Sequence, residues 1–350
     1  MAVLAKAPQT HFLTSLAQVP SRTRVNPDLT ILIYDRHLEK VSDEFRKFLT
    51  MFPVRFGVES GETLKSIESF SGFCERVSRS GFDLPTRQMT VLAVGGGSVG
   101  DFAGFFASVY KRGVRLVHLP TTWLAAIDSA HGGKTALNIG GAKNQIGTFY
   151  PAASTALVKS ILQTQGDDRI TDAMGELGKI ALIDGGTWVE KLESSPLEGA
   201  DLLWKFLKPA IESKMKVVRR DPREEKGLRQ VLNLGHTLGH VLEIEMGLSH
   251  GAAVAQGLFF ALEFSHQKRL LKDAPFEDAM SLLARLGLVP RPPAKALSST
   301  TMTRVLLHDK KREAQGEVTF VFLRDIGRTE RRSVAVSEIL TEARRQGWSS

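Results

Sequence analysis

Apolar residues in the first half of the chain occur in short runs that alternate with stretches of helical periodicity. Four runs have the β-branched composition of strands: "LTILIYD" (29–35), "VRFGVES" (54–60), "MTVLAVGGG" (89–97) and "VRLVHLPTT" (114–122). Helical patterns follow at least the second and third runs. This alternation predicts a parallel sheet with crossover helices.

After about Gly166 the pattern changes to long stretches with helical periodicity, such as "GADLLWKFLKPAIESKMKVV", "GLRQVLNLGHTLGHVLEIEMG" and "GAAVAQGLFFALEFSHQ". One exception, "EVTFVFLRDIGRTERRSVAV", alternates around a glycine-containing turn and predicts a hairpin. The proline-rich segment 289–299 connects helices, since helical patterning resumes after it. We therefore expect an α/β domain over residues 1–166 and a mainly α-helical domain over residues 167–350.

Composition narrows the setting of the protein. The chain has 350 residues, 42% of them hydrophobic, which is enough for a large core. Its single cysteine, Cys74, excludes an internal disulfide and a cysteine-based zinc site and suits a reducing compartment. No signal sequence and no apolar run of membrane-spanning length is present, so the sequence predicts a cytoplasmic protein with no membrane partner.

The net charge of +8 admits nucleic acid, an acidic surface or a small polyanion as partner. The Lys and Arg residues are scattered, and aromatic residues make up only 7% of the chain. Nucleic acid is therefore the less favoured partner.

The stretch "VLAVGGGSVGDFAGF" leads a strand into a glycine-rich turn. Gly95, Gly97 and Gly100 satisfy GxGxxG, and a helix is expected to begin near Gly100 or Asp101. Glycines allow close backbone approach, and a helix N-terminus offers N–H groups to a pyrophosphate. The alternative is a plain strand-to-helix turn.

A dehydrogenase fingerprint would place an acid about 20 residues further on, but "VRLVHLP" contains none. The preceding strand is followed by "SGETLKS", where Glu62 and Lys65 could reach ribose hydroxyls. The alternative is first-turn capping by Glu62 and a solvated Lys65.

Three histidines lie within fifteen residues: His236, His240 and His250. The i,i+4 spacing of His236 and His240 would let both face one metal ion. Core or surface histidines are the alternative, and an adjacent carboxylate would be needed to complete a cysteine-free zinc site.

The segment 95–152 concentrates charged residues in what read as loops between elements. Here the chain resembles the 3-dehydroquinate synthases and the wider sugar-phosphate cyclases, over nearly all of its length beyond residue 50. The resemblance rests on the motifs "GGGxxGDxAGFxAxxYxRG", "PTTxLAxxDS", "GGKTxxN", "KNxIGxFY", "GExxK", "GLRxxLNxGHTxGH", "HGxAVxxG" and "DKK".

The resemblance implies a Rossmann-like N-terminal domain that binds NAD, a helical C-terminal domain, and an active site in the cleft between them. It implies one divalent metal, zinc or cobalt, and a homodimer. The implied reaction converts 3-deoxy-D-arabino-heptulosonate 7-phosphate to 3-dehydroquinate and phosphate. Its steps are oxidation by NAD, phosphate elimination, reduction, ring opening and aldol closure, and the departing phosphate serves as the base for its own elimination.

Motif matching assigns Glu176, His236 and His250 to the metal and turns His240 to the substrate. The other implied substrate and catalytic residues are Arg112, Asp128, Lys134, Asn144, Lys179, Lys214, Arg229, Asn233, Lys310 and Lys311. The implied cofactor residues are Glu62, Lys65, Gly95, Gly96, Gly97, Asp101, Thr121, Thr122 and Lys143.

The chain departs from the family pattern in three places. His131 replaces a small or apolar residue, and "NIGGAKN" replaces "NHPLGKN". The segment "RDPREEKGLR" is one residue longer than usual, which leaves Lys214 and Lys216 as alternatives for one position. The two lysines of "DKK" are likewise alternatives.

Other functions are compatible with parts of the pattern. A related cyclase acting on another sugar phosphate, of the 2-deoxy-scyllo-inosose or sedoheptulose 7-phosphate type, would differ in the residues that bind the substrate carboxylate. An iron-type alcohol dehydrogenase would release NADH instead of regenerating NAD. A non-catalytic nucleotide-binding regulator would need neither the clustered cations nor the metal ligands.

Overall fold

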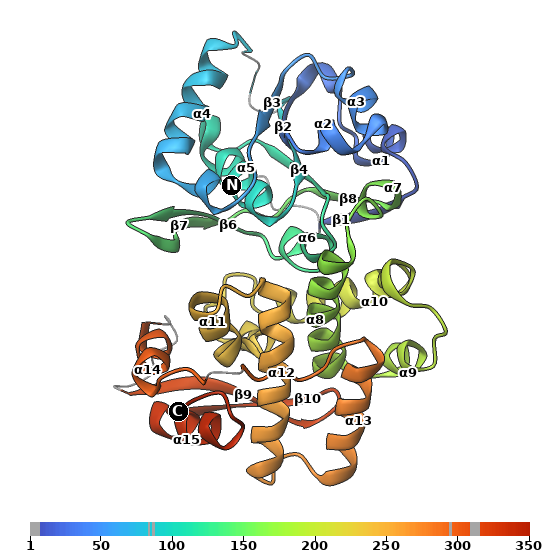
Figure 1. The fold of residues 1–350 in the computed structure, drawn as a ribbon. Coiled ribbons are helices and arrows are strands. Elements are labelled where there is room, and N and C mark those ends of the chain that lie inside the picture. Colours follow the sequence, from blue (N-terminus) through green and yellow to red (C-terminus); the bar gives the residue numbers. More distant parts are fainter. Residues whose placement is uncertain (1–7, 83–84, 86–87, 294–295, 309–315) are drawn as a thin grey trace. The chain divides into compact units, whose positions relative to one another are not determined.

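The computed structural model describes residues 8–82, 85, 88–293, 296–308 and 316–350. The chain divides into two compact units, Met1–Arg169 and Ile170–Ser350 (Figure 1). Among the helices of these described residues, none has both the length and the hydrophobicity needed to cross a membrane.

A six-stranded parallel sheet forms the centre of the first unit, with strand order β1-β8-β5-β4-β2-β3. The strands are β1 (Gln9–Leu13), β2 (Thr30–Asp35), β3 (Arg55–Val58), β4 (Thr90–Gly95), β5 (Arg115–Pro120) and β8 (Ser154–Val158). The predicted parallel sheet is confirmed, and all four predicted strands are present. Two further strands, β1 and β8, were not predicted, because they are five residues each and show no polar alternation.

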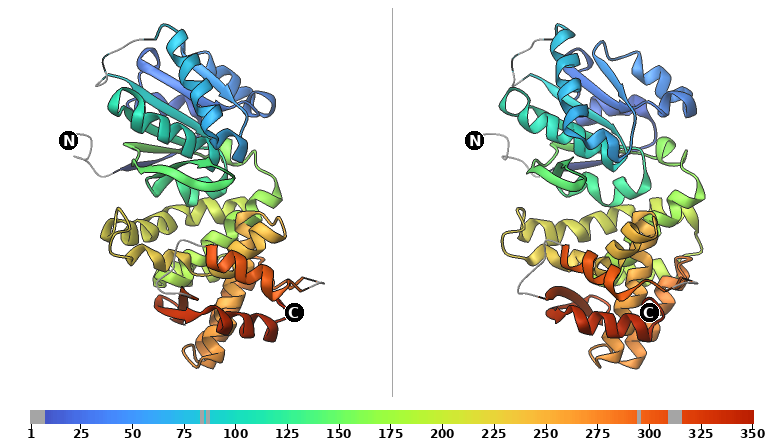
Figure 2. Two further views of the ribbon diagram at one scale, coloured as in Figure 1. Left: turned by 90° about the vertical axis from the view of Figure 1, so that its left-hand side faces the viewer. Right: turned by 60° about the vertical axis from the view of Figure 1, so that its left-hand side comes forward.

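Helices cover both faces of this sheet, as the alternation of buried residues in β2 shows. Ile31 and Ile33 join the core cluster of α4 (Ile67–Arg79) and α5 (Gly97–Val109). Leu32 joins the cluster on the other face, beneath the short helices at the start of the chain (Figure 2). Those short helices and the remaining ones of this unit are α1 (Val19–Thr23), α2 (Leu38–Val41), α3 (Asp43–Leu49), α6 (Trp123–Ile127) and α7 (Lys159–Leu162).

Strand order places the ligand-binding edge of the sheet. The chain runs outward from β2 to β3 and then returns to the other side of β2 as β4, so the order reverses between β2 and β4. In open parallel sheets, ligands bind at the carboxyl ends of the strands at this reversal. Those ends are Asp35 of β2 and Gly95 of β4.

The charged segment after α6 forms regular structure, and its description as loops was wrong. An antiparallel hairpin is built from β6 (Lys134–Ile139) and β7 (Ala142–Phe149). Thr135 and Leu137 point into the unit and are buried, whereas Lys134 and Lys143 are exposed. The buried side chains of one face therefore fix the hairpin to the rest of the unit, and polar side chains such as Lys134 project from its other face.

The second unit is mainly helical, as predicted. Its helices are α8 (Asp167–Asp184, beginning just before the unit boundary), α9 (Thr187–Glu193), α10 (Gly199–Arg220), α11 (His236–Glu245), α12 (His250–Gln267), α13 (Asp273–Arg285), α14 (Ser299–His308) and α15 (Val336–Arg345). The predicted hairpin is present as β9 (Glu317–Asp325) and β10 (Arg328–Ala335), with β9 against α12. Phe264 of α12 packs on Phe320 and Phe322 of β9, with ring centroids 5.2 Å away in both cases.

The histidine-containing stretch is two helices and not one. A 3₁₀ helix, η6 (Leu228–Asn233), ends before Leu234, and α11 begins at His236. Gly235 joins them with φ of 80°, and a Cβ there would lie 2.9 Å from the backbone nitrogen of Leu258. The break therefore depends on glycine, and it places His236 at the start of a helix.

Candidate metal and nucleotide sites

Three helices of the second unit bring one carboxylate and two imidazoles together. Glu176 lies in the middle of α8, His236 is the first residue of α11, and His250 is the first residue of α12. One potential ligand atom from each lies within 4.8 Å of the others. A cluster of this size can surround a single cation.

Glycine contacts allow these helices to approach so closely. A Cβ on Gly251 would lie 2.0 Å from the carbonyl oxygen of Asp172, and one on Gly257 would lie 1.8 Å from that of Gly235. A Cβ on Gly175 would lie 2.4 Å from the carbonyl oxygen of Gly251. The backbones of α8 and α12 therefore touch within one turn of the triad.

Hydrogen bonds set the tautomers of both imidazoles. Nδ1 of His236 lies 3.2 Å from the carbonyl oxygen of Leu234, and Nδ1 of His250 lies 3.0 Å from Oε2 of Glu243. Both partners can only accept, so each Nδ1 carries the hydrogen and each Nε2 offers a lone pair. These Nε2 atoms lie 3.9 Å and 3.5 Å from Oε1 of Glu176.

Glu176 is fully buried, and among the described residues neither of its oxygens has an aligned hydrogen-bond donor. Nζ of Lys179 lies 2.5 Å from Oε2 as an ion pair, one helical turn along α8. Burial by itself would raise the pKa of Glu176, but the Lys179 ammonium is the largest of the opposing effects, and the pKa lies below its usual value. The carboxylate is therefore charged, with Oε1 directed at the two imidazoles.

These features fit a divalent cation. Two imidazole lone pairs and a carboxylate oxygen face one point, where all three are acceptors and would repel one another without a positive charge. One carboxylate and two imidazoles are a known catalytic zinc set, which leaves positions open for a substrate. Zinc or cobalt suits this donor set better than calcium or magnesium, which prefer oxygen ligands alone.

His240 lies beside the triad but outside it. Its ring centroid is 5.5 Å from that of His236 and nearly perpendicular to it. His240 therefore borders the space around the triad.

Two further cations of this unit are buried in spite of their charge. Arg229 in η6 is 5% exposed, and its Nη1 donates to the carbonyl oxygen of Pro222 at 3.0 Å. Lys214 in α10 is also 5% exposed, whereas Lys216 is on the surface with its Nζ 3.2 Å from Oδ1 of Asp184. Lys214 and Lys216 thus differ in burial, and a buried lysine needs a specific partner.

Two of the other expected substrate residues are less buried than Arg229 and Lys214. Asn233 ends η6 and is partly buried, and Arg112 is exposed with φ of 65°. Lys310 and Lys311 lie outside the described residues.

In the first unit, the glycine loop forms the expected strand-to-helix turn. The helix α5 begins at Gly97, so the expected start at Gly100 or Asp101 was wrong. The first turn is already closed, because the backbone nitrogen of Gly100 donates to the oxygen of Gly96 at 3.0 Å. Gly95 and Gly96 therefore lie directly before a helix N-terminus, which is the arrangement that binds phosphate.

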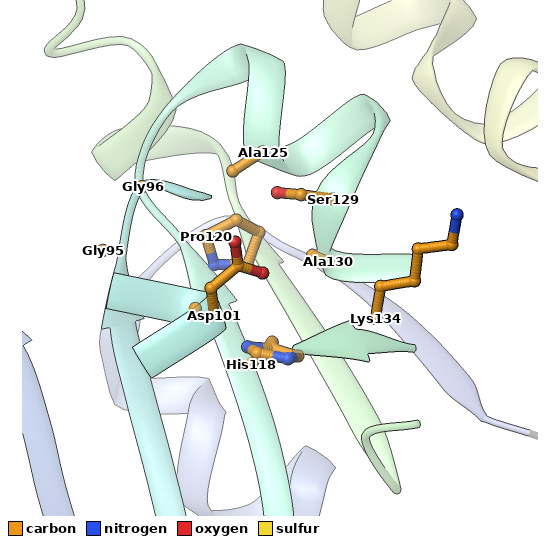
Figure 3. A pocket seen from close by; sticks show the side chains of 10 residues that line it. Gly95, Gly96, Asp101, His118, Pro120, Ala125, Ser129, Ala130 and Lys134 are labelled. Carbon is orange, nitrogen blue, oxygen red and sulfur yellow. The ribbon is translucent and has the colours of Figure 1, made fainter. Parts of the chain in front are cut away.

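A pocket opens beside this turn (Figure 3). Asp101 of α5, Ser129 after α6 and Lys134 of β6 surround it. Its other lining residues are Gly95, Gly96, Gly100, His118, Pro120, Ala125 and Ala130. Thr121 and Thr122 follow β5 immediately: the backbone nitrogen of Thr121 donates to Gly95, and the Thr122 hydroxyl caps α6.

Lys65 connects the glycine loop to the hairpin. It is 3% exposed, and its Nζ donates to Oδ2 of Asp101 at 2.8 Å and to Oδ1 of Asn144 at 2.5 Å. Glu62 is tied to the same hairpin, since its Oε2 accepts from Nδ2 of Asn138 at 2.8 Å. The expectation of a solvated Lys65, given as an alternative, was wrong.

The charge of Asp128 affects the pKa of Asp101. Burial raises the pKa of Asp101, and the Lys65 ammonium lowers it by less, so the pKa lies above its usual value. Glu62 and Asp128 add to the rise. A partly buried carboxyl group with a raised pKa, paired with Lys65, therefore borders the pocket.

Sequence reasoning missed His118 and Ser129, which line the pocket. It also missed Asp35, which ends β2; Tyr34 pairs with Val94, so Asp35 lies beside Gly95 at the reversal of strand order. An acid directly after the buried run "TILIY" was the available signal. His131, a departure from the family pattern, is buried with Nε2 2.9 Å from the carbonyl oxygen of Ala126.

His118 predicts a loss of stability in acid. Burial lowers its pKa from 6.5 to about 4, so the unfolded chain takes up a proton on this side chain at higher pH than the folded one. Its contribution is fully present above about pH 6.5 and falls as pH drops toward 4, by about 3 kcal/mol in total. We expect the free energy of unfolding, measured by urea titration, to lose this amount over that range. His118→Gln should show a smaller loss, and an identical loss would contradict the prediction.

Comparisons with known proteins bear on both sites. Residues 55–172 match the 3-dehydroquinate synthase N-terminal family, and residues 173–312 match the 3-dehydroquinate synthase C-terminal family. The 3-dehydroquinate synthase of Thermoanaerobacter pseudethanolicus is 34% identical over 328 residues, which cover 91% of this chain and 89% of that protein. The chain belongs to the 3-dehydroquinate synthase family. The enzyme of the same name from Pyrobaculum islandicum is 36% identical over 81% of this chain and 82% of its own.

Solved structures extend this family likeness. A 2-deoxy-scyllo-inosose synthase complexed with carbaglucose-6-phosphate, NAD⁺ and Co²⁺ has a TM-score of 0.84 and 26% identity, covering 98% of both chains. The 2-epi-5-epi-valiolone synthase ValA of Streptomyces hygroscopicus, with NAD⁺ and Zn²⁺ bound, shares the fold with a TM-score of 0.82, 23% identity and 99% coverage of both chains. An iron-containing alcohol dehydrogenase has a TM-score of 0.61 at 17% identity over 97% of both chains, which shows a more distant likeness of fold.

Proposed function

We propose that this protein is a 3-dehydroquinate synthase that converts 3-deoxy-D-arabino-heptulosonate 7-phosphate to 3-dehydroquinate and phosphate. It would thus be a phosphate-eliminating carbon–oxygen lyase of aromatic amino acid biosynthesis. The observation that carries the proposal is the triad of Glu176, His236 and His250 in a chain of this family. Two buried side chains with a positive charge, Lys179 and Arg229, lie close in sequence to residues of the triad. Such charges suit an anionic substrate.

Glu176, His236 and His250 are proposed as ligands of one zinc or cobalt ion. When bound, such an ion supplies a Lewis acid that lowers the pKa of a substrate hydroxyl. Lys179 holds Glu176 in its charged form, as the 2.5 Å ion pair indicates. His240 is proposed to contact the substrate and to move a proton on or off its oxygens.

The charged and polar residues of the expected substrate site are proposed to bind and orient the substrate. Arg229 would pair with the carboxylate, for which its planar guanidinium is suited. We assign the lysine position to Lys214 and not Lys216, because Lys214 is buried. The remaining proposed substrate residues are Arg112, Asp128, Lys134, Asn144, Asn233, Lys310 and Lys311. No side chain is assigned as the base for elimination, which the departing phosphate can provide for itself.

The first unit is proposed to bind NAD. Bound NAD⁺ would supply reversible hydride transfer to and from the substrate. Gly95, Gly96 and Gly97 would hold the pyrophosphate at the start of α5. The other proposed cofactor residues are Asp35, Glu62, Lys65, Asp101, Thr121, Thr122 and Lys143, with Lys65 also fixing the orientation of Asp101 and Asn144.

We expect the purified protein, supplied with NAD⁺ and zinc or cobalt, to release phosphate and 3-dehydroquinate in equal amounts from the heptulosonate phosphate. NADH should not accumulate, since the cofactor is regenerated. Phosphate and product are measured together by a coupled phosphate assay and chromatography. Phosphate without the cyclic product, or no turnover with fresh cofactor and metal, would overturn the proposal.

A related cyclase is the second candidate, because a 2-deoxy-scyllo-inosose synthase has a TM-score of 0.84 with this chain. Glucose 6-phosphate and sedoheptulose 7-phosphate lack the carboxylate of the proposed substrate. They should therefore turn over far more slowly than the heptulosonate phosphate. Arg229→Leu should slow the reaction of the heptulosonate phosphate more than that of the two sugar phosphates without a carboxylate. An alcohol dehydrogenase would be identified by stoichiometric NADH release.

We also propose a homodimer, which sedimentation of the purified protein tests.

A further inference from the structure

Glu243 lies on the same face of α11 as two of the histidines. His236, His240 and Glu243 are spaced i, i+4 and i+7, which places them in one row along the helix. Oε2 of Glu243 lies 3.0 Å from Nδ1 of His250, seven residues further along the chain and on a different helix. The motif comparison gave this glutamate no role.

The backbone of His250 is already held by another carboxylate. Asp172, one turn before Glu176 on α8, accepts a hydrogen bond from the backbone nitrogen of Ala252 at 3.2 Å and another from the Ser249 hydroxyl. The first turn of α12 is thereby fixed to α8. These bonds hold the backbone beside His250, and they determine neither the rotation of its ring nor which ring nitrogen carries the hydrogen.

The contact with Glu243 bears on both. A carboxylate accepts and cannot donate when ionised, so the contact requires hydrogen on Nδ1 and leaves the lone pair on Nε2. Nε2 is the nitrogen that lies 3.5 Å from Oε1 of Glu176. The negative charge of the acceptor also makes the ring a stronger electron donor through Nε2.

His236 offers an internal comparison. Its Nδ1 is bonded to the neutral carbonyl oxygen of Leu234, at 3.2 Å, and its ring is largely buried. The His250 side chain is 34% exposed and has less packing to hold it. The more exposed ligand is therefore the one whose orientation depends on a charged side chain.

We propose that Glu243 is a positioning residue for the metal site: it holds His250 in the Nδ1-protonated form with Nε2 presented to the cation. The inference rests on the proposed role of Glu176, His236 and His250 as metal ligands. Glu243 is not proposed as a ligand itself, and its role would be exerted through its contact with Nδ1 of His250.

The test measures the zinc dissociation constant by competition with a chromophoric chelator. We expect Glu243→Ala to raise it about 10- to 100-fold, as is usual for loss of such a partner. Glu243→Gln should rescue part of this loss, because its amide oxygen can still accept from Nδ1. The matched control is Glu245→Ala on the same helix, whose carboxylate pairs with Arg304 at 2.7 Å and should leave the dissociation constant unchanged.

His236→Ala distinguishes failure of the role proposed for Glu243 from failure of the proposed metal site. If it loses zinc while Glu243→Ala binds zinc as the wild type does, the role of Glu243 is wrong and the metal site stands. If His236→Ala also binds zinc normally, the proposed metal site itself is wrong. The ¹⁵N shifts of the zinc-loaded wild type give a reading that needs no variant to fold: His250 protonated on Nδ1 supports the proposal, and protonation on Nε2 overturns it.

Discussion

His236→Ala is expected to abolish stoichiometric binding of zinc or cobalt, whereas His240→Ala should retain the metal and lose turnover. His236 supplies one of three ligand atoms that lie within 4.8 Å of one another, and His240 supplies none of them. Loss of the bound cation would also take from the buried Glu176 a positive charge that balances its own. Metal content by mass spectrometry, together with phosphate release, measures both effects.

Equal loss of metal in both variants would show that the pair has been divided wrongly. His266→Ala is the matched control, because His266 lies in the same unit, at the end of α12, and bonds to Asp273. It should keep both metal and activity. Thermal unfolding of each variant with excess chelator separates loss of metal from loss of fold.

Gly251→Ala should disrupt the second unit and its metal site together. The added Cβ would lie 2.0 Å from the carbonyl oxygen of Asp172, which is backbone and cannot swing aside. Either α12 moves away from α8 or the helices distort, at a cost of about 3 kcal/mol, near the top of the usual range for overpacking. Urea denaturation should show this loss, and zinc affinity should fall because Glu176 and His250 are drawn apart.

Gly72→Ala provides the control. Gly72 lies within α4, and a Cβ there would meet no atom within 4 Å. The substitution should be neutral or stabilise by up to about 1 kcal/mol, because alanine favours helix more than glycine does. Normal stability and normal zinc affinity for Gly251→Ala would contradict the close contact of α8 and α12.

Much of the fold could be predicted from hydrophobic periodicity. The buried runs of β2 and β4 and the long helices α8, α10 and α12 follow patterns that local sequence determines. The separation of His236 from the preceding η6 could not be predicted in this way, because "GLRQVLNLGHTLGH" is apolar with helical spacing throughout. What breaks it is Gly235, whose positive φ and contact with Leu258 depend on a helix that follows later in the chain.

The site shows the same division. Clustered motifs pointed to Glu176, His236 and His250, and the structure brings these three together. The contacts that set their chemistry are long-range: Glu243 with His250, and Lys65 with both Asp101 and Asn144. Spacing along a chain carries no signal for a bond between residues 65 and 144, since it exists only once the β6–β7 hairpin lies against η3 (Glu62–Lys65).

The glycine contacts between α8 and α12 also bear on which ions the site can accept. Backbone touches backbone at Gly175 and Gly251, so the helices cannot move closer to suit a smaller ion, and Asp172 ties them against moving apart. Differences in ionic radius must then be absorbed by the side chains of Glu176 and His250 alone. Zinc and cobalt, which are nearly the same size, should exchange freely in such a frame, whereas a large ion with many oxygen ligands would find too little room.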